Sequence, residues 1–325
     1  MAGVLGSLSF PEMLDRRDNI ASCHTDTCRW ILDLDDFKNW EIQSRGLLWI
    51  KGKPGAGKST LMAFLYSQLS ESQELQEPPI RDGSIRLDFF FSARGTELQH
   101  TPLGMLRSLL NQLYDFDETV RPPVRKIFED RCRQYGYGEN HWQWTQVKLE
   151  EVLADAILES AKQHQVMVFI DALDEAGAQF AQHVVSYFHR LASRAEKIDA
   201  ALKICISCRH YPIAEDAQAV NIIVEAHNRD DIASYIENAF VGIAAGENQG
   251  DLKDLTKHLI RQADGVFQWI HLLVPSIKRR IAERESFDEI YSWLREVPAG
   301  LEEVYVYIIN YVIVEHNRRQ SFLLF

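Results

Sequence analysis

The chain has 325 residues, of which 46% are hydrophobic and 25% charged, the balance of an ordinary globular protein of one large or two smaller domains. Its formal net charge of −12 at pH 7 argues against a nucleic-acid-binding surface, which needs clustered positive charge. Five scattered cysteines do not describe the disulfide framework of a small secreted protein.

Residues 1–44 form an N-terminal segment whose apolar side chains, Leu8, Phe10 and Trp30 among them, predict packing on the core that follows. The segment lacks the basic start and apolar stretch of a signal peptide. No apolar run approaches the roughly 18 residues that a membrane span requires. We therefore expect a cytoplasmic protein that has no membrane span.

A short apolar run, 47–50, predicts a buried strand, and a Gly-rich turn and a helical pattern follow it. This stretch fits the phosphate-binding pattern GxxxxGK(S/T) at every fixed position. The glycines let backbone N–H groups wrap an anion, Lys58 can reach the β- and γ-phosphates, and the Ser59 hydroxyl can hold Mg²⁺. The nucleotide-binding residues that we predict are Gly52, Lys53, Pro54, Gly55, Ala56, Gly57, Lys58, Ser59 and Thr60.

Further apolar runs at 85–91, 165–171, 203–209 and 221–224 predict strands, with helical patterns between them. The stretch 115–144 shares no single period, and we expect a short helix and an aromatic loop there. Strands that alternate with helices predict a parallel α/β sheet with ligands at the carboxyl ends of the strands. The predicted domain covers residues 45–226.

Acidic residues gather where the strand 165–171 ends. Asp171 has the position of a magnesium-coordinating carboxylate, and Glu175 can orient the water that attacks the γ-phosphate. Asp174 either takes part in this catalysis or caps the next helix. Arg209 ends the following strand, where it contacts the γ-phosphate or forms a structural salt bridge with Asp171 or Asp174.

Two cysteines of the strand 203–209, Cys205 and Cys208, have the spacing of half a metal site. No second pair at a suitable spacing accompanies them, so we interpret them as buried strand thiols.

From residue 227 onward only helical spacing recurs, which predicts an all-helical domain over 227–298 and a further helical segment over 299–325. That last segment has an apolar face with nothing downstream to cover it, formed by Val304, Tyr305, Ile308, Ile309 and Val312 and then by residues 322–325. Such a face marks an interface or an aggregation liability, so we expect self-association. Removing residues 299–325 is expected to leave ATP binding intact.

Four motifs together resemble the NACHT-domain NTPases of fungal NOD-like receptors, which belong to the STAND class of P-loop ATPases. They are residues 49–62, 169–175, 207–212 and 263–269, in the family's order, and the resemblance extends from about residue 8 to the last residue.

The resemblance implies a P-loop NTPase sheet followed by a helical lid domain, with ATP (or GTP) and Mg²⁺ as ligands. Lys58 and Ser59 would be the Walker A pair, Asp171 and Glu175 the Walker B acids, and Arg209 the sensor. Gly265-Val266-Phe267 would open the segment that approaches the nucleotide, and Arg16 or Arg17 would lie near the base.

The chain departs from its relatives in several ways. Ala172 stands where Gly is frequent and Cys208 where Ser is common. Relatives continue into a winged-helix segment and then into repeats. Residues 299–325 would be the truncated start of that winged-helix segment. Relatives also carry an N-terminal effector domain.

The expected function is a switch that binds ATP and hydrolyses it slowly, in fungal non-self recognition or programmed cell death, with self-association through the NACHT domain. The alternatives are a nucleotide-binding scaffold without turnover and a metabolic P-loop kinase. A kinase needs an Arg-rich lid, and the region after residue 227 shows no such cluster.

Overall fold

The computed structural model describes residues 3–20, 23–24, 27–74, 84–136, 141–210, 219–241 and 249–312. The contacts between Cα atoms divide the chain into two compact units. Unit 1 comprises Met1–Cys23, Ile31–Lys51 and Lys58–Ile222, and unit 2 comprises His24–Trp30, Gly52–Gly57 and Ile223–Phe325. The domain bounds predicted from the sequence stay a prediction.

A five-stranded sheet in the order β2-β3-β4-β1-β5 is the centre of the α/β part. The pairs β1/β4, β2/β3 and β3/β4 are parallel. The predicted parallel α/β sheet is therefore confirmed. The strands are β1 (Gly46–Lys51), β2 (Ile85–Phe90), β3 (Val166–Asp171), β4 (Leu202–Cys208) and β5 (Val220–Ile223).

One strand, β4, lies between the strand that precedes the Gly-rich loop and the strand that ends in Asp171. In the parallel register Phe90 lies opposite Asp171 and Lys51 opposite Cys208, so the strand tips share one edge of the sheet. This is the edge where parallel sheets bind their ligands.

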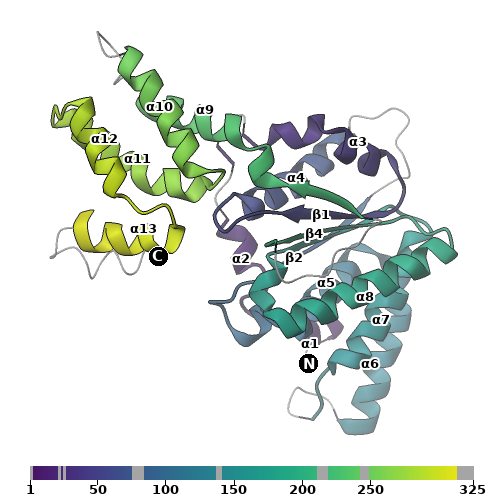
Figure 1. The fold of residues 1–325 in the computed structure, drawn as a ribbon. Helices are drawn as coiled ribbons and strands as arrows, with labels where there is room; N and C mark the ends of the chain where they lie inside the picture. The colour runs from purple at the N-terminus through teal and green to yellow at the C-terminus, as the bar shows by residue number, and fades with distance from the viewer. Residues whose placement is uncertain are drawn as a thin grey trace. The chain divides into compact units, whose positions relative to one another are not determined.

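Helices cover both faces of the sheet in unit 1: Figure 1 shows α4 over one face and α5, α7 and α8 over the other. Ile204 and Ile206 belong to the main core cluster together with α5, α7 and α8. Cys205 points to the opposite face, where its Sγ lies 3.6 Å from Met62 Sδ of α4. Cys205 and Cys208 are both buried, as predicted. The helices of this unit are α1 (Val4–Leu8), α2 (Asp15–Asp18), α3 (Asp35–Ile42), α4 (Lys58–Glu74), α5 (Pro102–Phe116), α6 (Arg121–Tyr135), α7 (Gln146–Ala161) and α8 (Ala178–Lys197).

Helix α6 is longer than the short helix predicted between residues 115 and 144. Its first turn holds Pro122 and Pro123, which are tolerated there because first-turn N–H groups have no partner within the helix. Val124, Phe128 and Cys132 form its buried face. The two prolines, which usually end a helix, obscure this spacing in the sequence.

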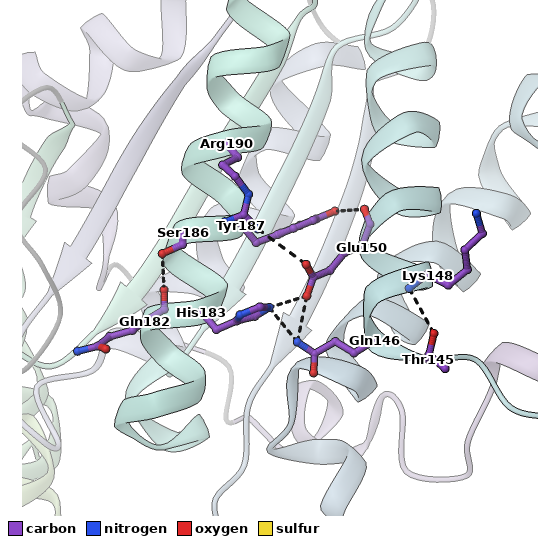
Figure 2. A network of polar contacts seen from close by, with 9 residues as sticks. All are labelled: Thr145, Gln146, Lys148, Glu150, Gln182, His183, Ser186, Tyr187 and Arg190. Atoms are coloured by element: carbon purple, nitrogen blue, oxygen red, sulfur yellow. Dashed lines mark hydrogen bonds and ion pairs between the residues drawn. The ribbon is translucent and has the colours of Figure 1, made fainter.

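Polar contacts join the outer surfaces of α7 and α8 (Figure 2). Glu150 of α7 is their centre: its Oε1 lies 2.5 Å from His183 Nε2 and accepts from Gln146 Nε2 at 3.0 Å. The Tyr187 hydroxyl donates to the Glu150 backbone oxygen at 3.4 Å, and Arg190 Nη2 lies 3.8 Å from Oε2. These contacts fix α8 beside α7.

Unit 2 has a core of its own, formed by its helices. Leu259, Trp269, Leu273 and Leu294 are among its fully buried side chains. The helices are α9 (Arg229–Phe240), α10 (Gln249–Ala263), α11 (Phe267–Ala282), α12 (Phe287–Glu296) and α13 (Leu301–Tyr307), and a π-helical turn follows at Ile308–Val312.

Two residues of the apolar face predicted in the segment 299–325, Val304 and Ile308, are covered, which corrects the expectation at these two positions. Val304 is fully buried and Ile308 nearly so, and both belong to the core of unit 2. The side chain of Gln268 in α11 donates to the Tyr305 hydroxyl at 3.2 Å. Helix α13 is thus part of the helical core. The residues after 312 lie outside the described part of the chain.

No helix among the described residues is both long enough and apolar enough to cross a membrane.

Candidate functional site

The Gly-rich loop Gly52–Gly57 connects β1 to α4. Two of its glycines have positive φ angles, +74° at Gly55 and +102° at Gly57, a region that residues with a Cβ rarely adopt. A turn closes the loop, because the Ala56 N–H donates to the Lys53 oxygen at 3.2 Å. The glycine spacing of the motif therefore has a conformational reason at two positions.

The helical residues of unit 2 support this loop. The Gln268 N–H donates to the Gly55 oxygen at 2.9 Å, and the Asn228 side chain donates to the Ala56 oxygen at 3.0 Å. A Cβ added to Gly55 would lie 2.8 Å from Gln268 and 2.9 Å from Leu301. The segment that opens α11, singled out in the sequence, thus contacts the loop itself.

Lys53 of the loop is held by carboxylates of unit 2. Its Nζ lies 2.5 Å from Asp264 Oδ2, and its N–H donates to Glu225 Oε2 at 3.3 Å. The motif predicts Lys53 among the nucleotide-binding residues. In the structure its ammonium group forms an ion pair with Asp264.

Asp171 lies at the tip of β3 and is fully buried. The Ser207 hydroxyl donates to its Oδ1 at 2.5 Å and accepts from the Ala172 N–H at 2.8 Å. Its Oδ2 is buried and has no hydrogen-bond partner among the described residues. Burial raises the pKa of this carboxyl, and hydrogen bonds from Ser207 and Ser59 oppose the rise.

These two residues fit a magnesium ion. Mg²⁺ takes oxygen ligands, commonly one or two carboxylates with water and phosphate oxygens. The unpaired Oδ2 of Asp171 is such a ligand, and the Ser59 hydroxyl helps to stabilise the charged form of the same carboxyl. No cluster of three or more His, Cys, Asp or Glu side chains suited to a metal occurs in the described ranges. A cation here would complete its coordination with ligand oxygens and water.

Lys58 begins α4, directly after the loop. Burial lowers the pKa of its ammonium group, and the charges of Asp174 and Asp171 oppose that decrease. The first residue of α4 therefore places a cation close to the acids at the tip of β3. This proximity is what a site for a metal-bound polyphosphate requires.

Asp174 and Arg209 form a two-point contact. Arg209 Nε lies 2.8 Å from Asp174 Oδ2, and the Arg209 N–H donates to Oδ1 at 3.1 Å. The sequence left Arg209 open between a phosphate contact and a salt bridge. In the structure Arg209 makes the salt bridge, while about half of its side chain is exposed.

Glu175 is fixed by two neighbours of unit 1. Its Oε2 accepts from the Ala93 N–H at 2.9 Å, and its Oε1 lies 3.8 Å from Arg16 Nη2. The next residue, Arg17, points elsewhere and pairs with buried Asp88 at 2.8 Å. The sequence could not separate the two arginines, and the structure places Arg16 beside the acid.

Residues 26–209 match the family described as Nephrocystin 3, N-terminal. The vegetative incompatibility protein HET-E-1 of Podospora anserina is 25% identical over 310 residues, which are 88% of this chain and 20% of that protein. The chain thus spans about one fifth of this relative. A solved structure of PCH-2 from C. elegans is 15% identical with a TM-score of 0.32, over 77% of this chain and 59% of that one. A TM-score this low carries no conclusion about the present chain.

Proposed function

The chain belongs to the nephrocystin 3 N-terminal family, and from this membership we propose that it binds ATP or GTP with Mg²⁺ and hydrolyses it slowly as a signalling switch. One observation carries the proposal: the carboxyl of buried Asp171 keeps one oxygen, Oδ2, without a partner among the described residues, while the Ser59 hydroxyl and the Lys58 charge both act on this carboxyl. A buried carboxylate oxygen without a partner is costly, and such groups mark functional sites.

In this proposal Lys58 neutralises charge on the β- and γ-phosphates, while Ser59 and Asp171 hold Mg²⁺. The ion supplies charge neutralisation between the phosphate oxygens. Backbone N–H groups of residues 52–60 hold the phosphate chain.

Glu175 orients the attacking water in this proposal. Two contacts, from the Ala93 N–H and from Arg16, hold its carboxylate in place without neutralising it through a short ion pair. Arg209 stabilises the γ-phosphate. It reaches the ligand from the end of β4, and Asp174 keeps its side chain there until the phosphate competes for it.

The signalling role rests on the relative. A vegetative incompatibility protein acts, by its name, in fungal incompatibility, so we propose a role in non-self recognition or programmed cell death. We also keep self-association of the nucleotide-bound state as part of the proposal. Light scattering with ATP, with ADP and without nucleotide tests this self-association. A protein that stays monomeric under all three conditions would contradict it.

Binding and turnover are tested separately. Lys58→Ala is expected to weaken ATP binding at least tenfold in calorimetry, which corresponds to about 1.4 kcal/mol. The surface variant Lys162→Ala should bind like the wild type. Equal affinity in Lys58→Ala would contradict the phosphate-loop assignment, and a side-by-side titration with GTP determines the base preference.

Glu175→Gln is expected to bind ATP and Mg²⁺ and to release phosphate far more slowly than the wild type. If Asp174→Asn abolishes hydrolysis and Glu175→Gln does not, Asp174 is the catalytic acid. A wild type that binds ATP without any phosphate release would favour the scaffold function. Phosphate transfer to an added acceptor would favour a kinase.

A further inference from the structure

Asn228 precedes α9 and is almost completely buried, with 2% of its surface exposed. Its Nδ2 donates to two backbone oxygens, that of Ala56 at 3.0 Å and that of Gly265 at 2.8 Å. Because both acceptors are carbonyls, the NH₂ group of the amide must face them. The opposite atom, Oδ1, is buried without a partner among the described residues.

We propose that Asn228 is a positioning residue for phosphate binding, which orients the Ala56–Gly57 peptide so that the Gly57 N–H faces the phosphate. The inference rests on the proposed nucleotide binding and adds a residue that the motif does not contain. Asn228 acts through the loop and does not itself touch the ligand.

Peptide geometry gives the first reason. In a planar trans peptide the C=O and the following N–H point in opposite directions. Since the Ala56 oxygen accepts from Asn228, the Gly57 N–H points to the other side of the loop. In phosphate-binding loops of this pattern the backbone N–H groups hold the phosphates. Asn228 therefore fixes a donor on the side away from itself.

The rigidity of the surroundings gives the second reason. Gly265 has φ +79°, and a Cβ on it would lie 2.3 Å from the Glu225 side chain, so its backbone is closely packed. Its carbonyl thus anchors the Asn228 amide. The preceding loop carbonyl, that of Gly55, is fixed by the Gln268 N–H. The carbonyls of Gly55 and Ala56 are thus both held by hydrogen bonds, the first from a backbone N–H and the second from the Asn228 side chain.

A side chain can be tested by substitution. Asn228→Asp keeps the shape and replaces the donating NH₂ with an oxygen that repels both carbonyls. Asn228→Ala removes the donor without adding charge. The control is Asn238→Asp in α9, where the amide is exposed and, among the described residues, its side chain donates to Ser234 at 3.4 Å.

We expect both Asn228 variants to bind ADP and inorganic triphosphate at least tenfold more weakly than the wild type, and the control to be unchanged. The loss in Asn228→Asp should shrink between pH 8 and pH 5.5, because the protonated carboxyl can donate to one carbonyl. The loss in Asn228→Ala should show no such recovery relative to the wild type. The charged and titratable groups around this position are His227, which precedes Asn228 in the chain and stacks on Trp30, and Lys53 with its partners Glu225 and Asp264. Both variants retain them.

Unchanged affinity, or the same loss at every pH in both variants, would overturn the inference. Should neither variant fold, wild-type protein labelled with ¹⁵N-glycine provides the test. The Gly57 amide signal should move to lower field when inorganic triphosphate is added, and a static signal would overturn the inference. A different result would contradict the proposed function and not this inference: neither the wild type nor Lys58→Ala binds ADP or triphosphate.

Discussion

Asp171 shows how a single buried carboxylate links stability to ligand binding. Burial raises its pKa above the usual value of 3.8. The folded protein therefore holds this proton more tightly than the unfolded chain does, and stability decreases as the pH rises from that usual value through the raised pKa. At neutral pH the ionised group lowers the free energy of unfolding unless a cation compensates for it.

Asp171→Asn is accordingly expected to raise the free energy of unfolding of the ligand-free protein at pH 7 by about 1 kcal/mol, because no buried charge remains. The same variant should lose the tightening of ATP binding by Mg²⁺. Urea unfolding at several pH values and calorimetry with and without Mg²⁺ measure the two effects. A variant that is less stable at pH 7, or that retains the magnesium effect, would contradict this account.

Ala172 has a left-handed backbone conformation, with φ 54° and ψ 44°. This region costs an L-residue with a Cβ about 1–2 kcal/mol, and glycine far less. Ala172→Gly is therefore expected to stabilise the protein by up to about 1 kcal/mol after the higher entropy of the unfolded glycine chain is subtracted. The matched control is Ala176→Gly, equally buried but at negative φ, which should destabilise it; thermal unfolding compares the two.

The site residues divide by how much their positions depend on tertiary structure. The phosphate-binding motif and Asp171 follow from local patterns, because an apolar strand ending in an acid or in a Gly-rich turn reads directly from the sequence. Asn228 and Ser207 carry no such pattern, since their partners lie 172 and 36 residues away along the chain. The start of α12 also has a local signal in the sequence, because Ser286 and Glu289 have the spacing of a capping box and form one in the structure.

At the scale of elements, α13 tests whether the segment after residue 299 belongs to the helical core. Val304 is fully buried, while Val306 in the same helix is 57% exposed. Val304→Asn buries an amide in an apolar core and should lower the free energy of unfolding by about 2–4 kcal/mol. Val306→Asn should change it by less than about 0.5 kcal/mol.

Urea unfolding monitored by tryptophan fluorescence compares these two variants. Equal stability would show that α13 contributes nothing to the core. Because Leu301 of this helix also lies against Gly55, removing residues 299–325 is expected to disturb the phosphate loop as well. This reverses the prediction that the truncation leaves ATP binding intact.

At the scale of the whole molecule, we expect nucleotide binding to slow hydrogen exchange in the helices whose first residues contact the loop. The carbonyls of Gly55 and Ala56 accept from Gln268 and Asn228, so a loop ordered by phosphate also orders the start of α9 and of α11. Hydrogen exchange should slow at these two starts when ATP is added to the wild type. Helix α6, which has no loop contact among the described residues, serves as the internal control, and Lys58→Ala should abolish the effect. Protection confined to unit 1 would contradict this coupling.

The parallel sheet was predictable because strands that alternate with helices along the chain leave few topologies. The membership of the loop in unit 2 was not predictable, because it depends on contacts between residues about 170 to 210 positions apart, such as those of Lys53 with Glu225 and with Asp264.

That membership has a consequence for anyone who exchanges modules between relatives. The contact boundary falls within the motif, between Gly57 and Lys58, and again between Ile222 and Ile223. A chimera joined only at the second boundary would set a foreign Asn228 and Gln268 against the native loop. A chimera that exchanges residues 24–30 and 52–57 together with the helical segment from residue 223 onward keeps the native contacts of the loop. These three segments therefore have to be exchanged together.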